Sequence, residues 1–577
     1  MPALLGGPAA ADSARTDGTD AMQDPDDFST YHAGLLEGRY DCVDRMVLNA
    51  YFPLGQTGGG FRHWWRLLTG SDKTLDTEHL QRMAGDFSRR VHAYAKKHGI
   101  PIEHCKPDER KHRLAEKRLP QDPNFRGVFL ILVGKAPARV WKVKRASNGQ
   151  PHLEPQTPWP YVNHYHFHII DPDWGHLTVK ISGHPPFGCQ IMLNGHEWVE
   201  RRARQQTRPE VAFSKAGNCF VGGCLQAVDR IADTLRDPCV TGRLTQVCDR
   251  WVYSACLCFG LSQEEQRRSA FRYQYSCYQL EHSRNLLFKS GRTLDEVFQA
   301  LIDRSRGWLD VPRLKTIFGR KRRPNACTRR GTRVRIERVL DESDWDTTVF
   351  KVHWGKITLK IYDKGKRVLR VEAIAHNVSE LRLGRSVDKL PEMVGELQRM
   401  TVAFLQVVQA ADVRFLDTRA LDNLHEPTQR GARRVAGVDL NKERVRAVAK
   451  AAVALASNPA GFTSAELSHR VHRELGKAAQ YGPRQAVYDL AKLRGKSLAE
   501  RVGKTKRYRL SADGIRILVG MTVLRDKVIK PVVAGMGKRR SRAPLKYRHP
   551  LDVHYENLQI EMRHTLKLLQ VQTDAAA

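Results

Sequence analysis

Apolar residues in the last quarter of the chain recur at spacings that predict a short series of helices and strands. Thr463, with Glu466 three residues later, has the pattern of a capping box, and Leu467, Val471 and Leu475 follow at helical spacing. The same reasoning predicts, in order, a second helix over 483–494, two short strands around 498–502 and 508–510, and a third helix over 511–528.

The apolar pattern differs between the N-terminal region and the body. Over 29–124, the positions of Leu80, Phe87 and Val91 on one helical face predict a mainly helical region. From residue 125 onward, short apolar or alternating runs predict strands of a sheet at 128–133, 140–144, 161–170, 176–182 and 190–194. Further patterns predict helices within 223–305, 386–416 and 440–457, and a hairpin over 348–376 with its turn at 363–366.

These elements together predict an α+β multidomain fold. Residues 1–28 are rich in Ala, Gly, Asp and Thr and poor in large apolar groups, so we expect them to be disordered. The remainder divides into a helical N-terminal region, a central mixed β-sheet body with helices and a basic loop, a C-terminal unit of helices and strands, and a basic tail. Their expected bounds are 29–124, 125–425 with the loop at 318–335, 440–530 and 531–577.

The charge of the chain favours nucleic acid as its partner. Its 96 Lys and Arg exceed its 62 Asp and Glu, which gives a formal net charge of +34. Each phosphate that such a protein neutralises releases a counterion and adds affinity. No run approaches the roughly 18 apolar residues that a membrane span needs, so we expect no membrane partner. The 11 Cys include no Cys-x-x-Cys pair and the N-terminus has no signal-peptide pattern, so we expect reduced thiols in a cytoplasmic protein.

The C-terminal unit has the order helix, helix, strand, basic tip, strand, helix, and its tip at 503–507 reads GKTKR. In this it resembles the winged helix-turn-helix domains of bacterial DNA-binding proteins. The resemblance implies that the second helix enters a major groove, where Arg and Gln can read base edges, while the tip holds phosphates. A winged helix used for protein contacts is the alternative. The implied DNA-binding residues are Tyr481, Arg484, Gln485, Tyr488, Lys492, Lys504, Lys506 and Arg507.

A second motif is the run of alternate histidines in NHYHFHIID, residues 163–171. Alternate side chains of a strand point the same way, so His164, His166 and His168 are expected to line one face. There they can close on a divalent metal ion, or simply face phosphates or water.

His-Phe-His at 166–168 also resembles the His-hydrophobic-His strand of rolling-circle replication initiators and related transposases. That resemblance implies a divalent metal, Mg²⁺ or Mn²⁺, and a tyrosine on a nearby helix that attacks DNA. The tyrosine candidates are Tyr273, Tyr275 and Tyr278, none of which lies in a Tyr-x-x-Lys arrangement.

A third group of residues is acidic and lies in the body. Cross-strand pairing in the hairpin is expected to bring Tyr362, Arg370 and Glu372 together, with Glu281 as a further carboxylate. A carboxylate among cations and near a metal suits phosphodiester cleavage, so Glu281, Glu372 and Tyr362 are the candidate catalytic residues. The alternative is an ordinary salt bridge on a solvated sheet. The segment YDKGKRVLRVE, residues 362–372, also resembles a hairpin of phage-type replication initiators.

These patterns lead to one functional hypothesis and two alternatives. The hypothesis is a DNA-binding protein of mobile-element or replication type, with a winged helix for site recognition and metal-dependent strand cleavage in the body. Whether the protein is an endonuclease at all stays open, and a homodimer is one expected assembly. The alternatives are a non-catalytic winged-helix transcription regulator and an RNA-binding scaffold that stacks bases on Trp141, Tyr165 and Phe167.

Overall fold

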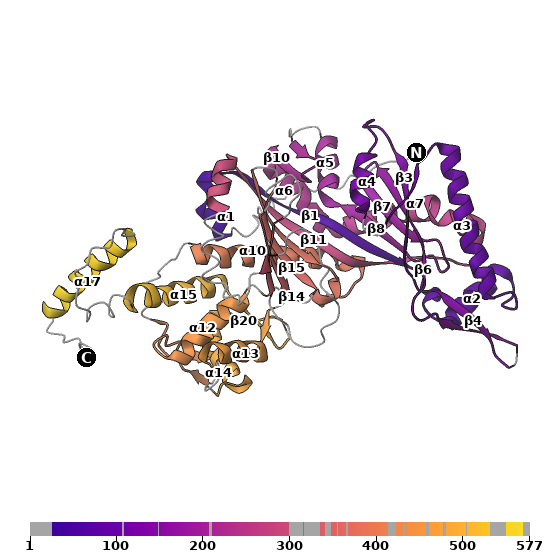
Figure 1. Cartoon of the computed structure of the whole chain (residues 1–577). Helices are drawn as coiled ribbons and strands as arrows, with labels where there is room; N and C mark the ends of the chain where they lie inside the picture. The colour runs from indigo at the N-terminus through magenta and orange to yellow at the C-terminus, as the bar shows by residue number, and fades with distance from the viewer. Residues whose placement is uncertain are drawn as a thin grey trace, which may run out of the picture.

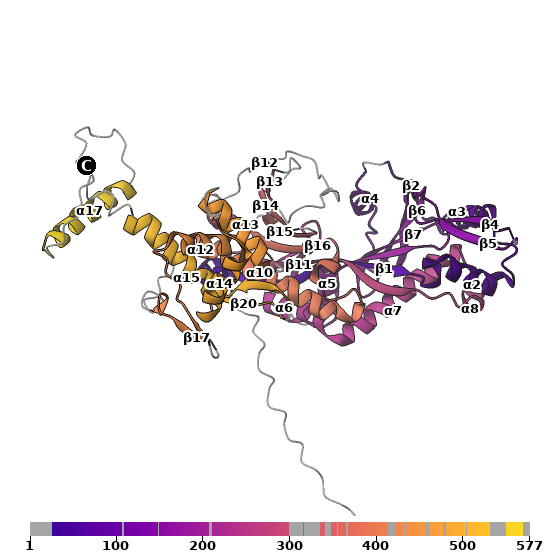
Figure 2. The same ribbon diagram turned by 90° about the horizontal axis from the view of Figure 1, so that it is seen from below.

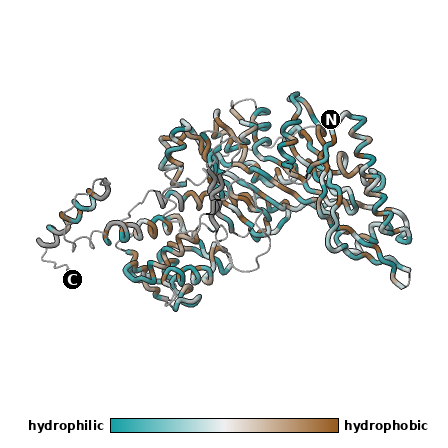
Figure 3. The backbone as a smooth tube through the Cα atoms, viewed as in Figure 1, coloured by the Kyte–Doolittle hydropathy of each residue, from teal (hydrophilic) through white to brown (hydrophobic). Residues whose placement is uncertain are grey.

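The computed structural model has the α+β multidomain architecture that the sequence predicts (Figure 1). It describes residues 26–106, 109–147, 149–206, 211–298, 315–316, 335–340, 348–354, 356–364, 367–412, 423–430, 433–456, 458, 461–476, 480–503, 505–530 and 550–568. Hydrophobic stretches run along the strands of the central sheet (Figure 3). The long helix α3 (Thr77–His98), at the right of the view, is mostly hydrophilic (Figure 3).

A twelve-stranded sheet forms the centre of the described structure. From one edge to the other its strands are β12 (Lys315–Thr316), β13 (Arg335–Leu340), β14 (Thr348–Trp354), β15 (Ile357–Lys364), β16 (Val368–Ala375), β11 (Gln274–Phe288), β1 (Leu36–Tyr51), β8 (Cys189–Asn194), β7 (Gly175–Ser182), β6 (Tyr161–Asp171), β3 (Gly127–Pro137) and β2 (Ile102–His104). The strands predicted around β3, β6, β7 and β8, and the predicted β15–β16 hairpin, are confirmed.

The two central strands, β1 and β11, join the two halves of the sheet. They pair antiparallel along almost their whole length. β8 pairs only with the C-terminal half of β1, from Arg45 to Ala50, and β16 pairs only with the C-terminal half of β11, from Leu280 to Leu287. Because the two strands run in opposite directions, the two half-sheets extend from opposite ends of this central pair.

These same two strands correct the sequence prediction. The region 29–124 contains the predicted helices, but β1 occupies Leu36–Tyr51 within it, and the helical pattern expected over 223–305 is interrupted by β11. Both strands are buried on both faces over much of their length. A strand buried on both faces does not alternate between apolar and polar residues, so its period of two is absent from the sequence.

Helices cover the faces of the sheet, and further helices form the C-terminal unit and the segment after it (Figures 1 and 2). They are α1 (Asp27–Tyr31), α2 (Gly58–Thr69), α3 (Thr77–His98), α4 (Lys111–Lys117), α5 (Gly195–Gln205), α6 (Leu225–Asp233), α7 (Pro238–Ala255), α8 (Gln263–Arg268), α10 (Leu390–Asp412), α12 (Glu443–Ala456), α13 (Ser464–Leu475), α14 (Pro483–Gly495), α15 (Ala512–Val523) and α17 (Pro550–Leu568). Four short strands form two hairpins beside the sheet: β4 (Trp141–Arg145) with β5 (Pro151–Pro155), and β9 (Val211–Ser214) with β10 (Cys219–Gly223). A third pair is β17 (Thr428–Arg430) with β18 (Arg433–Val435).

Local signals place several of these helices where the sequence predicts them. α3 begins after Asp76, whose side chain accepts a hydrogen bond from the His79 N–H, and ends at Gly99 in the left-handed conformation. None of the described helices is long and apolar enough to cross a membrane.

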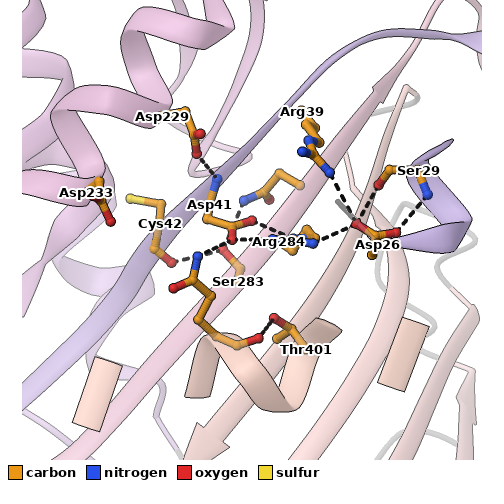
Figure 4. A network of polar contacts seen from close by, with 12 residues as sticks. Asp26, Ser29, Arg39, Asp41, Cys42, Asp229, Asp233, Ser283, Arg284 and Thr401 are labelled. Carbon is orange, nitrogen blue, oxygen red and sulfur yellow. Dashed lines mark hydrogen bonds and ion pairs between the residues drawn. The ribbon is translucent and has the colours of Figure 1, made fainter. Parts of the chain in front are cut away.

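A buried ion network ties α1, β1, β11 and α10 together (Figure 4). The Arg284 guanidinium donates to both oxygens of Asp41, each at 2.8 Å, and to Asp26 at 2.6 Å. Gln398 of α10 donates to the same Asp41 carboxylate at 3.1 Å. Asp229 of α6 accepts the Asp41 backbone N–H at 2.8 Å, on the edge of β1 that β8 leaves open. The network thereby provides hydrogen-bond acceptors both for the backbone N–H of Asp41 at the strand edge and for the buried Arg284 guanidinium.

The C-terminal unit contains the predicted elements in the predicted order. Thr463 caps α13 in a capping box with Glu466, α14 runs from Pro483 to Gly495, and α15 starts after Ser511. A small sheet of order β19–β21–β20 accompanies them, formed by β19 (Phe462–Thr463), β21 (Arg507–Leu510) and β20 (Ala499–Arg501). α15 is shorter than expected, since the backbone continues as a π-helix over Leu524–Ile529.

Several predicted segments fall partly or wholly outside the described residues. The segment expected to be disordered, 1–28, ends within ordered structure, because Asp26 and Phe28 are buried and 1–25 lie outside the described residues. The basic loop at 318–335 lies outside them except for Arg335, which begins β13. Of the basic tail 531–577, the described part is α17, which lies apart from the other helices in both views (Figures 1 and 2).

Candidate functional site

The first candidate surface is the outward face of α14. Pro483 occupies the first turn, where its missing N–H is not needed. Arg484 is exposed, and Val487 and Tyr488 are each 49% exposed, although a helix normally buries its apolar residues. The Lys492 ammonium lies 4.6 Å from the centre of the Tyr488 ring. α14 therefore presents the Arg484 guanidinium and the Tyr488 ring to solvent.

Three other residues predicted to contact DNA from α14 support the helix from within. Tyr481 and Lys492 are buried, and both contact the buried carboxylate of Asp489: the Tyr481 hydroxyl donates at 3.0 Å, and the Lys492 ammonium lies at 3.0 Å. The Gln485 side chain accepts the Gly482 N–H at 2.9 Å and so caps the helix. Tyr481, Lys492 and Gln485 thus orient α14, and Arg484 and Tyr488 remain as the outward pair.

The β20–β21 hairpin carries the predicted basic tip. Lys506 is exposed, whereas Arg507 donates to the Gly461 carbonyl oxygen at 2.6 Å and lies 3.7 Å from Glu466. Arg507 therefore braces the hairpin against the start of α13. Lys504, the third predicted residue of the tip, lies outside the described residues.

The second candidate is the histidine strand, which the structure identifies as β6. His164, His166 and His168 share one face, as predicted, and all three are buried. The His164 Nδ1 lies 3.2 Å from the Val162 carbonyl oxygen. The His168 Nδ1 lies 3.0 Å from His176 Nε2 and 3.1 Å from the Thr178 hydroxyl.

Burial sets the protonation state of these histidines. It lowers the pKa of His164 to about 4 and of His168 to about 3, and it lowers the pKa of His166 as well; for His164 and His166 nearby lysines add to the effect. Neutral imidazole is the form that can bind a metal. Among the residues that the structure describes, however, no group of three or more His, Cys, Asp or Glu side chains is placed to hold a metal ion. The Nδ1 atoms of His164 and His168 face protein partners, whereas His168 Nε2 is buried without a hydrogen-bond partner among the described residues, so a metal at this strand stays a prediction.

The third candidate is a polar face formed by β1, β11, β16 and β15. Tyr362 pairs with Arg370 across β15 and β16, and Lys360 pairs with Glu372, so the predicted cross-strand grouping of Tyr362, Arg370 and Glu372 is confirmed. The Lys360 ammonium lies 2.8 Å from the Glu372 carboxylate. Lys360 is accessible on one side, whereas Glu372 and Arg370 are buried.

Glu281 belongs to the same face. Its position on β11 is two residues from Ser283, the direct partner of Glu372, which places both carboxyl groups on one side of the sheet. Burial raises the pKa of Glu281 to about 7, and the neighbouring Glu372 carboxylate adds to the shift. Glu281 is therefore half protonated near neutral pH, beside a lysine and a second carboxylate.

Sequence reasoning did not connect this face with Asp44 and His196, which lie next to Arg370. Asp44 Oδ1 accepts from Arg370 at 3.1 Å and lies 2.9 Å from His196 Nδ1. Its second oxygen, Oδ2, is buried without a hydrogen-bond partner among the described residues. Despite the burial, Arg370 and then His196 hold the pKa of Asp44 well below its usual range. No local signal could have found this contact, because more than 150 residues separate Asp44 from each partner in the sequence.

Lys364 completes the face at the end of β15. Burial, followed by repulsion from Arg370, lowers the pKa of Lys364 to about 8, and its ammonium lies 5.8 Å from the centre of the Tyr362 ring. An amine and a carboxylic acid that both titrate near neutral pH on one surface can exchange protons with a ligand.

The histidines and the carboxylates do not converge. Both lie on the same face of the sheet, since His166, Lys180, Gln190 and Asn49 are successive direct partners toward β1. Five strand spacings of about 4.8 Å, or about 24 Å, nevertheless separate β6 from β16. A single metal cannot join His166 to Glu372 in this arrangement.

The tyrosines and the stacking aromatics also differ from expectation. Tyr275 and Tyr278 lie on β11 and Tyr273 directly precedes it, so none is on a helix. The Tyr273 hydroxyl donates to the Phe187 carbonyl oxygen, and the Tyr275 hydroxyl donates to Asp249 at 2.6 Å. The aromatics expected to stack bases are buried in the core, where tertiary packing covers them: Trp141, Tyr165 and Phe167.

No protein-family model, curated protein or solved structure matches the chain. The assignment of roles to its residues therefore rests on geometry and charge.

Proposed function

We propose that the protein binds duplex DNA, with the unit from α12 to α15 acting as a winged helix-turn-helix. The observation that carries the proposal is that some side chains of the α14 region point to solvent while others hold the helix in place. Arg484 and Tyr488 point outward, while Tyr481 and Lys492 fix the helix from behind through Asp489. A recognition helix needs this combination, because its base contacts are specific only if the helix is held rigidly.

The charge distribution supports the same proposal. Lys506 lies exposed at the hairpin tip, where a phosphate contact positions a protein without reading sequence. The chain as a whole carries a formal net charge of +34, which favours a polyanion. A mobile-element or replication role is the context that we propose for this binding.

The test uses the full chain and a pool of random duplexes from which bound sequences are selected. Arg484→Ala is expected to weaken binding to the selected site by roughly 10-fold or more and to relax its base preference at one position. Lys506→Ala should weaken binding to all duplexes alike and reduce the salt slope by about 1. Arg82→Ala on α3, another exposed arginine, is the control and should bind normally. Equal affinity of all three variants would contradict the proposal.

DNA strand cleavage in the body is a second candidate function, favoured by one observation. Glu281, whose pKa is raised to about 7, lies on the same face as the Lys360–Glu372 ion pair, so two carboxyl groups in different surroundings share one face. Such a pair can give a proton to a leaving oxygen and take one from an attacking water.

The cleavage test incubates labelled single- and double-stranded DNA and RNA with Mg²⁺, with Mn²⁺ and with EDTA. We expect products that Glu281→Gln and Glu372→Gln abolish while DNA binding persists, and a parallel His166→Ala variant reports whether the histidine strand contributes. Binding without products under every condition would leave the non-catalytic regulator as the better account. A strong preference for structured RNA would favour the RNA-binding scaffold.

A further inference from the structure

Two aromatic side chains are unusually exposed where the chain enters β6. Trp159 is 53% and Tyr161 is 70% exposed. Of the other tryptophans whose side chains the structure describes, Trp251 is half-buried and five are buried: Trp64, Trp65, Trp141, Trp174 and Trp198. Large apolar rings gain from leaving water, so two open rings within three residues form a candidate ligand surface.

We infer that the end of the sheet where β3 finishes and β6 begins, called this edge below, binds single-stranded DNA. Trp159 and Tyr161 would stack bases, and Lys135 and Arg139 would contact phosphates. The inference extends the proposed DNA-binding function to a second surface and a second form of the same ligand.

Strand pairing brings the aromatic rings and the cations together. Tyr161 is the direct partner of Pro137, and Asn163 is the direct partner of Lys135. Beyond the ladder, the Ala138 N–H donates to the Pro160 carbonyl oxygen at 3.0 Å, which keeps the two segments side by side. Paired residues lie on the same face, so exposed Lys135 lies diagonally across from Tyr161.

Arg139 and Trp159 flank the last contact of the two segments. The Ala138 N–H donates to the Pro160 carbonyl oxygen, so the backbones meet one residue before Arg139 and one residue after Trp159. The Arg139 guanidinium lies 4.9 Å from the centre of the buried Trp141 ring, which fixes the cation at the surface. Arg139 therefore does not need a carboxylate partner to be held in position.

The charge of this edge complements a phosphate backbone. The two segments 134–140 and 156–163 contain no Asp and no Glu. The neighbouring carboxylate of Glu154 is already neutralised by Lys144 at 2.7 Å, and Lys142 is exposed nearby on β4. Lys135 and Arg139 have no carboxylate partner among the residues that the structure describes. Open aromatic rings beside such cations are the combination by which proteins hold single strands without sequence preference.

The position of the edge separates it from the duplex-binding unit. The β4–β5 hairpin, next to this edge, and the unit from α12 to α15 lie at opposite ends of the molecule in both views (Figures 1 and 2). A double helix held at α14 and a single strand held at Trp159 do not compete for space.

The experiment measures the affinity of the full chain for a labelled oligothymidylate of about 20 nucleotides, long enough for one stacking surface, and for a duplex of equal length. The double variant Trp159→Ala, Tyr161→Ala is expected to lose about 10- to 100-fold in affinity for the single strand, while its affinity for the duplex is unchanged. Trp159→Phe, Tyr161→Phe keeps two ring faces and should retain most of the affinity, which excludes a folding defect as the cause.

Two controls separate this inference from the proposed function. Arg484→Ala should weaken binding to a duplex that carries the selected site by roughly 10-fold and keep single-strand binding, so failure of one surface does not hide the other. Tyr31→Ala removes an equally exposed aromatic from α1 and should change neither affinity. The inference is overturned if the double alanine variant binds the single strand normally, or if Tyr31→Ala loses as much. It is also overturned if the surface binds an oligouridylate but not the oligothymidylate, since the ligand is then RNA.

Discussion

Arg284 and Arg370 lie on adjacent strands of one sheet, both are buried, and they face opposite sides. Arg284 on β11 donates twice to Asp41 and once to Asp26. Arg370 on β16 donates to Asn285 at 2.6 Å, to Asp44 at 3.1 Å and to the Asn218 carbonyl oxygen at 2.6 Å. Two carboxylates thus hold the Arg284 guanidinium, whereas one carboxylate, an amide oxygen and a backbone carbonyl oxygen hold that of Arg370.

The surroundings of the two arginines differ. Both oxygens of Asp41 accept charge-assisted hydrogen bonds, whereas Asp44 Oδ2 has no partner among the described residues. Near Arg370 there are also Glu281 and Lys364, whose pKa values are shifted to about 7 and about 8. We call a network closed when all its buried polar atoms have hydrogen-bond partners, and open when one of them has none. A closed network stabilises a fold, whereas an open one has an atom that can still bind a ligand. We therefore propose a structural role for the Arg284 side and a functional role for the Arg370 side.

The largest expected effect comes from breaking the closed network. Arg284→Met leaves Asp41 buried without its cation and Asp26 with only the more distant Arg39, so we expect it to destabilise the fold by about 3–5 kcal/mol. Urea unfolding would measure the loss. Arg39→Met is the matched control, because Arg39 pairs with the same Asp26 at 3.5 Å but is partly exposed, and it should cost less than about 1 kcal/mol. Equal losses in the two variants would show that Arg284 is not the centre of the network.

A smaller effect, with a distinctive pH dependence, is expected on the open side. The pKa of Glu281 is raised from its ordinary 4.5 to about 7, so the folded state binds this proton more tightly than the unfolded state. The resulting stability is fully present below about pH 4.5 and is lost as the pH rises through about 7. Glu281→Gln removes the dependence, and the variant should exceed the unmodified protein in stability at pH 8 by on the order of 3 kcal/mol.

The measurement for Glu281 is the unfolding free energy at pH 5 and at pH 8. Glu78→Gln on α3, a well exposed glutamate, is the control and should follow the unmodified protein at both values. Asp41 provides the contrast, because Arg284 lowers its pKa despite burial. Its contribution is therefore present at neutral pH and lost only when the pH falls through that lowered value. A Glu281→Gln variant that is less stable at pH 8 would contradict the raised pKa.

The sequence predicted the parts of this molecule that local signals determine. The Thr463–Glu466 capping box located α13, and alternation in the β15–β16 hairpin grouped Tyr362, Arg370 and Glu372 on one face. These features depend on residues that are close in the chain, where spacing alone decides which side chains meet.

The remainder depended on contacts that spacing does not encode. β1 and β11 escaped prediction because neighbours bury both of their faces and remove the alternation. Asp44 reaches Arg370 across 326 residues, and the exposure of Trp159 rather than Trp141 is decided by which surfaces the fold covers. The histidine strand shows both outcomes. The shared face of His164, His166 and His168 was predicted, whereas their distance from Glu281 and Glu372 was not.

The smallest expected effect sharpens the functional side of the comparison. Tyr362 hydrogen-bonds to Arg370, so Tyr362→Phe should cost about 1 kcal/mol of stability, the net value of one hydrogen bond. The phenyl ring still packs, and its face still lies near the Lys364 ammonium. If the Arg370 side is only structural, Tyr362→Phe will change unfolding slightly and leave every nucleic-acid assay unchanged. If it is a reaction centre, the same small change in stability will accompany a large loss of cleavage. Comparing the unfolding free energy and the cleavage rate of this one variant therefore decides whether the network around Arg370 acts on a ligand or only contains an unpaired oxygen at Asp44.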